Sequence, residues 1–339
     1  MKLERLRDRA RVLDPRNGFA ESPSEVEVRI DPLTSARARI NISRSSRPKQ
    51  ALKRAEEGPP QKCPFCPENI EKETPKFPQD LVAEGRIKSG GATLFPNLFP
   101  LSGVHAICAF TPAHRLDIDS FKPEEILDGL ICCRSLFEVG EARELRNHFL
   151  GWNHLPPAGA SILHPHFQAL ITEKPLLGPS SLFEASEIYA RREGRCYWSE
   201  IVDVELGSAR FIGETPGFTW LAPWAPMGSF EVIGIGKKSS MLVLDPGEMR
   251  GLALGITKVL GGLWNLGVTS INMGLYSMPR GDGKGSFRTQ VRIMARPSGT
   301  ISDRALLELY GGEVGVTTLP EEYAKSMRER FLGHSGADA

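Results

Sequence analysis

The sequence predicts an α+β fold made of two tandem copies of one unit, each a mainly antiparallel sheet with a packed helix. The order strand, helix, strand, strand begins at Val104 and again near Gly228, a repeat of roughly 120 to 125 residues. The 339 residues are 40% hydrophobic and 24% charged, which is typical of a soluble globular protein with one large core or two ordinary ones. We place the two units at residues 1–195 and 196–339.

The N-terminal segment precedes the repeat. Residues 1–25 mix Arg, Glu, Asp and Pro with weak periodicity, and we expect a short helix followed by irregular chain. Val26–Ile30 and Ala36–Ile42 alternate polar and apolar residues around a turn and predict a hairpin. Arg44 and Arg47 follow beside two serines, so this loop could hold a phosphate by charge-assisted bonds. A solvated basic loop is the alternative.

A Cys-x-x-Cys pair follows a polar, proline-rich linker. Cys63 and Cys66 can supply two thiolates to a tetrahedral zinc ion, which is half of the ligands that the ion needs. His114 and His164, which lie near the ends of expected strands, are the candidates for the other two. A redox role is less favoured, because the pair does not lie between a strand and the start of a helix.

The first copy of the repeat begins with a strand over Val104–Thr111. A helix should start at Pro123, with acidic residues in its first turn where the helix dipole favours them, and continue to about Arg146. Strands over Asn147–Trp152 and from Ser161 through Gln168 complete the copy.

The last of these strands carries the candidate site. Side chains alternate along a strand, so His164, His166 and Gln168 should share one face. Pro165 lacks a backbone donor, which is tolerated at the start of a strand or at a sheet edge. Three polar side chains on one face favour a functional site over a core, although a pair of surface histidines is the alternative for any His-x-His sequence.

The second copy repeats the elements without the histidines. We expect a strand over Gly228–Ile235, a helix from Asp245 to about Leu266, and strands over Ser270–Leu275 and Phe287–Ala295. When the two copies are aligned, His164 falls near Arg288 and His166 near Gln290, and His114 falls opposite Ser239. The sequence therefore predicts a site in the first copy and its loss from the second.

Charge and composition exclude several functions. The formal net charge is +1 and the pI about 7.7, so no global field attracts nucleic acid or an anionic membrane. No stretch approaches the ~20 apolar residues of a membrane span, and Met1–Asp8 is too charged for a secretory signal. Six cysteines in so long a chain do not form a disulfide scaffold. We expect a cytoplasmic protein with no nucleic-acid or membrane partner.

One combination of motifs is specific enough to indicate a family. It joins His164-Pro165-His166-x-Gln168 to an upstream Cys63-Pro64-x-Cys66, and with it the chain resembles the galactose-1-phosphate uridylyltransferase family, a duplicated branch of the histidine-triad superfamily. Shorter matches extend the resemblance over most of the chain: Arg29-x-Asp31-Pro32-Leu33-Thr34, Arg47-Pro48, Asn97 with Phe99-Pro100, Pro112-x-His114, Asn153, Gly159-x-Ser161, Phe230-Glu231 and Pro320-Glu321.

The resemblance implies two histidine-triad-like units joined into one larger, half-barrel-like sheet, and it implies roles for individual residues. Cys63, Cys66, His114 and His164 would bind one structural Zn2+ ion, and His166 would be the nucleophile. Gln168 would donate to the transferring phosphoryl group. The remaining ligands would be Asn153 and Ser161 for phosphate oxygens, Asn97 for the nucleotide, and Arg44 and Arg47 as phosphate contacts.

These roles fit the chemistry of the side chains. A neutral imidazole at His166 can attack the α-phosphorus and form a nucleotidyl-histidine. Gln168 is uncharged yet a donor, and histidine-triad hydrolases have a third histidine at its position. Transfer to a second phosphate is therefore favoured over hydrolysis.

The leading hypothesis is a transferase of galactose metabolism that exchanges a nucleoside monophosphate between a nucleotide sugar and a hexose 1-phosphate. The resemblance also implies a homodimer. It implies that Glu313 and Gly315 contact the sugar of the substrate, because they lie in a segment loosely similar to the family's sugar-contacting loop. The family's second metal site is not expected, because Arg288, Gln290 and Arg292 occupy that region. The alternatives are an ADP-sugar or diadenosine polyphosphate phosphorylase that uses the same histidine, and a non-catalytic nucleotide-binding protein.

Overall fold

A computed structural model describes residues 1–46, 62–296 and 305–332. Its main element is a ten-stranded sheet in which every neighbouring pair is antiparallel, with the strand order β4-β5-β6-β8-β7-β12-β13-β11-β10-β9. The strands are β4 (Ile87–Ser89), β5 (Ala92–Pro96), β6 (Val104–Ala109), β7 (Asn147–His154), β8 (His166–Thr172), β9 (Phe211–Thr215), β10 (Phe218–Leu221), β11 (Val232–Gly236), β12 (Ser270–Tyr276) and β13 (Gln290–Arg296).

The strand order reads as two halves that mirror each other. Strands β4, β5, β6, β8 and β7 on one side correspond to β9, β10, β11, β13 and β12 on the other, and the halves meet where β7 pairs with β12. The predicted α+β fold, two tandem units joined into one large open sheet, is confirmed. The division of the chain at residue 195 stays a prediction.

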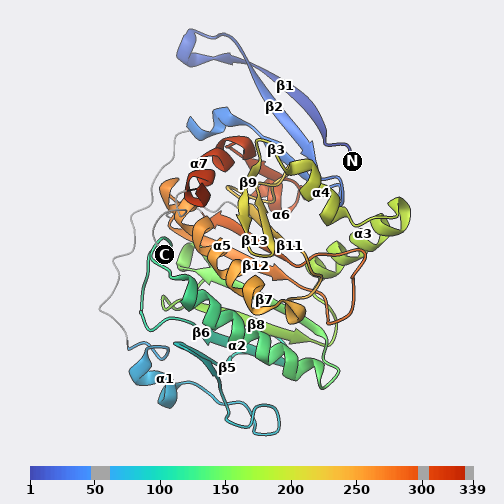
Figure 1. Ribbon diagram of the computed structural model, residues 1–339. Helices are drawn as coiled ribbons and strands as arrows, with labels where there is room; N and C mark the ends of the chain where they lie inside the picture. The colour runs from blue at the N-terminus through green and yellow to red at the C-terminus, as the bar shows by residue number, and fades with distance from the viewer. Residues whose placement is uncertain (47–61, 297–304, 333–339) are drawn as a thin grey trace.

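One helix from each copy covers the same face of the sheet. Helices α2 (Pro123–Glu141) and α5 (Pro246–Asn265) pack against each other across the middle of the sheet (Figure 1). Both begin with proline at the first position, where its missing N–H costs no hydrogen bond, and α5 has a capping box formed by Asp245 and Glu248. Burial of apolar side chains such as Trp152, Phe167 and Trp220 between helices and sheet forms the main core.

The other face of the sheet is covered unevenly. Helices α3 (Leu177–Glu193) and α4 (Tyr197–Glu205) contribute to a second apolar cluster with strands of the second copy, including Ile233 and Ile235. Helix α7 (Pro320–Leu332), in contrast, belongs to the main core, where it lies against α5 and β9. No helix in the described ranges is long and apolar enough to cross a membrane.

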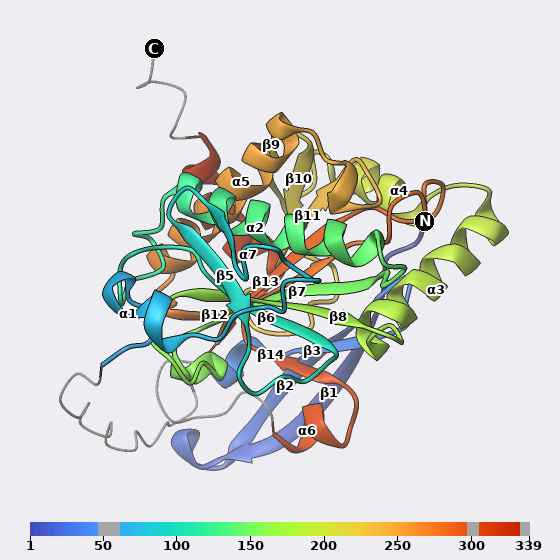
Figure 2. The same ribbon diagram turned by 90° about the horizontal axis from the view of Figure 1, so that it is seen from below.

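A small four-stranded sheet lies across the large sheet from α2 and α5 (Figure 2). It contains β1 (Glu4–Asp14), β2 (Ala20–Ile30), β3 (Arg37–Ile40) and the short strand β14 (Val314–Val316), which pairs parallel with β3. The remaining short elements are α1 (Pro67–Glu73), α6 (Leu306–Leu309) and four 3-10 turns, at Pro15–Asn17, Ile42–Ser46, Pro156–Ala158 and Met241–Val243.

The expectation of a helix and irregular chain over residues 1–25 was wrong. This segment is most of a long hairpin, with β1 and β2 paired from Glu4↔Ile30 to Asp14↔Ala20. Arg5, Arg7, Arg9 and Arg11 fall on alternate positions, a period of two that is the strand signal. Most of this hairpin is exposed, so neither strand needs an apolar face. The usual alternation of polar and apolar residues is therefore weak, and the strands were not recognised from the sequence.

Candidate active site

His166 is the first residue of β8, and its ring is almost completely buried. Nδ1 lies 2.8 Å from the backbone carbonyl oxygen of His164. A carbonyl oxygen can only accept, so Nδ1 carries the hydrogen and Nε2 keeps its lone pair. Burial lowers the pKa of His166, which favours the neutral ring. This imidazole has the tautomer that a nucleophile at Nε2 requires.

His164 does not lie on the strand as expected. Residues 161–165 form a turn, and β8 begins only at His166, so His164, His166 and Gln168 do not form one alternating row. Pro165 cannot donate a ladder hydrogen bond, which explains why pairing starts after it. The buried ring of His164 instead takes part in a cluster with the Cys-x-x-Cys pair.

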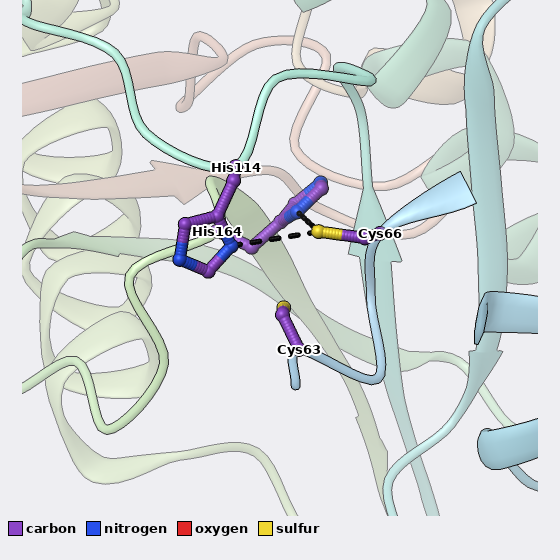
Figure 3. A group of neighbouring side chains, drawn as sticks. All are labelled: Cys63, Cys66, His114 and His164. Carbon is purple, nitrogen blue, oxygen red and sulfur yellow. Dashed lines mark hydrogen bonds between the residues drawn. The ribbon is translucent and has the colours of Figure 1, made fainter. Parts of the chain in front are cut away.

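The four predicted metal ligands come together. One ligand atom each from Cys63, Cys66, His114 and His164 lies within 4.8 Å of all the others, and Figure 3 shows the side chains converging. Cys66 Sγ is 3.5 Å from His114 Nδ1 and 3.7 Å from His164 Nδ1. Tetrahedral bonds to zinc would separate sulfur and nitrogen by about 3.5 Å. The donor set and its spacing therefore fit a zinc ion.

The atoms around the cluster orient its ligands. His164 Nε2 lies 2.8 Å from the carbonyl oxygen of Thr111, which fixes the hydrogen on Nε2 and leaves Nδ1 for a metal. The Asn69 side chain donates to the carbonyl of Cys63 at 2.8 Å, and α1 begins directly after Cys66. Without a cation, burial and the neighbouring Cys63 raise the pKa of Cys66 to about 11. A bound metal would hold both sulfurs as thiolates.

The short segment between Cys63 and Cys66 also contacts His166. The ring of Phe65, between the two cysteines, packs edge-on against the ring of His166 with centroids 5.4 Å apart. Phe65 packs against Phe95 of β5 as well, at 5.2 Å. The segment that carries the two cysteines thus packs directly against His166.

Gln168 and Asn153 lie beside His166 on the sheet face opposite the helices. Trp152 pairs with Phe167 across β7 and β8, so the next residues, Asn153 and His166, are neighbours. Gln168 faces Gly151 in the same ladder. Gly151 in turn faces Gly274 of β12, and the ring of Phe149 packs over both glycines, where a side chain would crowd it.

The sequence analysis did not identify two further residues next to the candidate site. His105 of β6 lies 3.1 Å from the side-chain oxygen of Gln168, and Asn272 of β12 donates to the side-chain oxygen of Asn153 at 2.7 Å. His105 lies in a strand of otherwise apolar residues, on the same face as Gln168. A single histidine within an apolar run was the feature of the sequence that could have identified it. Asn272 belongs to the second copy, and no motif in the sequence marks it as part of the site.

The other predicted contacts are distributed differently. Asn97 lies next to His105, with its side-chain nitrogen 3.4 Å from that ring, whereas Ser161 is exposed in the turn before β8. Arg44 is exposed in the turn after β3, and Arg47 lies outside the described residues. Their predicted roles stay predictions.

Glu313 and Gly315 lie in the small sheet and not beside His166. Glu313 forms ion pairs with Arg37 and Arg39 of β3, and Gly315 is part of β14. Any contact with a sugar would have to be made from this second sheet, so that role also stays a prediction.

On the corresponding face of the second copy, charged and polar side chains pair with one another. Arg292 of β13 donates to Glu231 at 3.2 Å, and Gln290 accepts from Arg292 at 3.3 Å. A cavity of about 230 Å³ lies over this half, lined among others by Trp198, Tyr276 and Arg292. It lacks the histidines of the first copy.

Comparison with known proteins places the chain. No family model matches it. It is 32% identical to an uncharacterized protein of Archaeoglobus fulgidus over 312 residues, which cover 90% of this chain and 92% of that protein. The chain and this archaeal protein belong to one family. It is also 24% identical over 257 residues to ADP-glucose phosphorylase of Arabidopsis thaliana, covering 68% of this chain and 71% of that enzyme.

Two solved structures show the fold. One is the crystal structure of ADP-glucose phosphorylase from Arabidopsis thaliana with bound ADP-glucose, which superposes with a TM-score of 0.72 at 20% identity. The match includes 90% of this chain and 99% of that enzyme's chain. A uridylyltransferase structure gives a TM-score of 0.70 at 20% identity, with 91% and 99% coverage. The chain has the fold of the galactose-1-phosphate uridylyltransferase family, which confirms the resemblance seen in the sequence.

On this uridylyltransferase fold, the site combines three chemical capacities. It has a neutral imidazole with a free Nε2, two carboxamides beside it, and a cluster suited to a structural metal. The named neighbours are a uridylyltransferase and an ADP-glucose phosphorylase. The arrangement suits nucleophilic attack on phosphorus.

Proposed function

We propose that the protein is a nucleotidyltransferase that moves a nucleoside monophosphate between a nucleotide sugar and a hexose 1-phosphate through a covalent nucleotidyl-histidine. The observation that carries the proposal is the tautomer of His166. Its Nδ1–H is held by the carbonyl of His164, and the lone pair of Nε2 is left for attack. A neutral donor, Gln168, lies on the same strand two residues further on.

The reaction would proceed in two half-reactions. His166 Nε2 attacks the α-phosphorus, a P–N bond forms, and the P–O bond to the β-phosphate breaks so that sugar 1-phosphate leaves. In the second half, a phosphate oxygen of the acceptor attacks the same phosphorus, the P–N bond breaks, and His166 regains its lone pair. Gln168, Asn153 and Ser161 would donate hydrogen bonds to the phosphoryl oxygens as charge develops.

A zinc ion bound by Cys63, Cys66, His114 and His164 would have a structural role. All four ligand positions of a tetrahedral ion would be taken by side chains, which leaves no place for substrate. The cluster would hold the turn before β8 and the ring of Phe65 in place. Both determine the position of His166.

A second candidate is phosphorolysis of an ADP-sugar, with inorganic phosphate as the acceptor. It is supported by the similarity to ADP-glucose phosphorylase of Arabidopsis thaliana, in sequence and in fold. The first half-reaction is identical, so the same His166 would serve. The two candidates differ in the base of the nucleotide and in the acceptor.

The deciding experiment is intact-protein mass spectrometry after incubation with UDP-glucose or ADP-glucose. A UMP adduct that galactose 1-phosphate discharges supports the transferase, and an AMP adduct that inorganic phosphate discharges supports the phosphorylase. No adduct with either nucleotide sugar would contradict both and leave a non-catalytic nucleotide-binding protein. Peptide mapping should place the adduct on His166.

We also infer a homodimer and a cytoplasmic location. The dimer follows from the family resemblance, in which a partner chain completes the sugar site, and Glu313 and Gly315 would then act on the partner's substrate. Light scattering that shows a monomer at micromolar concentration would contradict it. All six cysteines are free thiols, which fits a reducing compartment.

A further inference from the structure

We infer that His105 and Asn272 are positioning residues that fix how two carboxamides face the transferring phosphoryl group. Each of them binds the side-chain oxygen of its partner, Gln168 or Asn153, and so leaves the NH2 group of that partner for phosphate. The inference rests on the proposed function, because it assigns an orientation to residues that would contact the phosphoryl group. It adds two residues that neither the sequence motifs nor the comparisons assign.

The orientation of Gln168 follows from a backbone group two hydrogen bonds away. The backbone N–H of Leu101 donates to His105 Nδ1 at 3.0 Å. A backbone N–H can only donate, so Nδ1 is the acceptor nitrogen of a neutral ring and the hydrogen lies on Nε2. Nε2–H then donates to Gln168 Oε1 at 3.1 Å. Within the described residues, the NH2 group of Gln168 has no hydrogen-bond partner.

The orientation of Asn153 follows in the same way from a backbone carbonyl. The carbonyl oxygen of Ala158 can only accept, and it lies 2.9 Å from Asn272 Nδ2. This contact identifies Nδ2 as the NH2 group, which also lies 2.7 Å from Asn153 Oδ1. Asn153 therefore presents its oxygen to Asn272. In the part of the chain that the structure describes, its own NH2 group makes no hydrogen bond.

Strand register brings both NH2 groups to the nucleophile. His166, Asn153 and Asn272 occupy adjacent places across β8, β7 and β12. Gln168 lies one alternation further along β8 on the same face as His166. Two NH2 donors can thus flank one phosphoryl group on His166 Nε2.

The polarity matters because a phosphoryl group is an anion. A carboxamide that turned its oxygen toward it would repel the charge that the NH2 group stabilises, and an unanchored carboxamide can turn either way. Preorganised donors stabilise a transition state without reorganisation cost at the moment of reaction. His105 and Asn272 supply that preorganisation, and Asn272 comes from the second copy.

The test is a pair of double-mutant cycles on the single-turnover rate of nucleotidylation at saturating nucleotide sugar. His105→Phe and Asn272→Ala should each slow this rate about 10–100-fold, the usual effect of removing a residue that orients a ligand. In the Gln168→Ala background His105→Phe should have no further effect, and likewise Asn272→Ala in the Asn153→Ala background. Zinc content and thermal midpoint are measured for every variant.

Two further variants test polarity. His105→Gln keeps an NH2 donor and should restore most of the rate lost in His105→Phe. Asn272→Asp can only accept when ionised, so Asn153 would turn its NH2 toward it and its oxygen toward phosphate, and the rate should fall below that of Asn272→Ala. His148→Phe, at a second buried histidine that bonds Ser277, is the matched control and should leave the rate unchanged.

The outcomes separate this inference from the proposed function. Rates that fall by the same factor with and without Gln168 or Asn153 would show a general structural effect and overturn the inference. So would an Asn272→Asp variant at least as fast as Asn272→Ala. If the wild-type protein forms no adduct with any nucleotide sugar, the proposed function itself fails, and the inference fails with it.

Discussion

The two copies of the unit each join two side chains at equivalent strand positions, but the two pairs differ in chemistry. In the first copy, Gln168 lies on β8 and is bound by His105, two residues before Ile107, its cross-strand neighbour on β6. In the second copy, Arg292 lies on β13 and is bound by Glu231, two residues before its cross-strand neighbour on β11. Gly151 and Gly274 lie between the two pairs.

The difference shows how equivalent positions of a duplicated fold can hold a neutral pair in one copy and an ion pair in the other. The pair of His105 and Gln168 is neutral and leaves one donor unused, as a site for an anion needs. The pair of Arg292 and Glu231 is charged, buried on the glutamate side, and lies beneath the aromatic residues Trp198 and Tyr276. The first copy therefore leaves the NH2 group of Gln168 without a partner in the described residues, beside His166, while Arg292 and Glu231 of the second copy pair with each other. The second copy has an unpaired NH2 group of its own, that of Gln290, but this group is buried.

The largest effect should come from removing the nucleophile. His166→Gly should lower nucleotidyl exchange at least about 10⁴-fold, because without the imidazole no covalent intermediate forms. Zinc content and fold should persist, since Nε2 of His166 makes no structural contact in the described residues. Added imidazole should restore part of the turnover by filling the vacated space.

The corresponding residue of the second copy is the control. Gln290→Gly should leave exchange within a few-fold of the wild type, because this strand carries no reacting group. Wild-type kinetics should be ping-pong, with parallel double-reciprocal lines. Intersecting lines, or an adduct that survives in His166→Gly, would contradict the mechanism.

Loss of the metal cluster should have the next largest effect and should also be confined to the first copy. Cys63→Ser with Cys66→Ser, or His164→Ala, should remove zinc and lower the free energy of unfolding by several kcal/mol, because metal binding contributes to folding. Elemental analysis and thermal denaturation measure both quantities. Cys196→Ser, a buried cysteine before α4, should leave the zinc content unchanged. Undiminished zinc in the double cysteine variant would exclude this cluster as the metal site.

Breaking the ion pair of the second copy should affect stability more than catalysis. Glu231→Gln leaves the guanidinium of Arg292 largely buried without its counter-charge and should cost about 2–3 kcal/mol, measured by urea unfolding. Burial raises the pKa of Glu231 even beside the guanidinium of Arg292. Nucleotidylation in the folded variant should stay within a few-fold of the wild type. A loss as large as that in His105→Phe would show that the copies are not separated in function.

Acid should destabilise the protein through the first copy. Burial lowers the pKa of His148 and of His154 to about 4, below the ordinary value of about 6.5 in the unfolded chain. The unfolded state therefore binds more protons between these pH values, and stability falls as the pH drops from about 6.5 to about 4. Each group should contribute about 1–3 kcal/mol across this range.

His148→Phe tests the acid prediction. Urea unfolding at several pH values should show a smaller loss of stability below pH 6.5 in this variant than in the wild type. Hydrogen exchange should show the acid effect in β7 before β13, since every histidine in the described ranges belongs to the first copy. An unchanged pH dependence in His148→Phe would contradict the prediction.

The sequence was most informative where a pattern is local. A repeat of strands and helices, a Cys-x-x-Cys pair and a His-x-His pair are each contained in a short segment, and they predicted the duplicated fold and the four residues of the metal cluster. Residues 1–25 were misread because charged residues dominate an exposed hairpin. There the period of two was present, but the apolar residues that usually reveal it were few.

What the sequence by itself determined was which side chains could do chemistry, because nucleophiles, thiols and donors are properties of single residues. Only the tertiary structure decided how they act together. The turn at Pro165 moves His164 out of β8 and into the metal cluster. Register between β7 and β12 brings Asn272 to Asn153, and pairing of β6 with β8 brings His105 to Gln168. Such contacts join residues 63 and 119 positions apart, and they depend on strand pairing that no local pattern encodes.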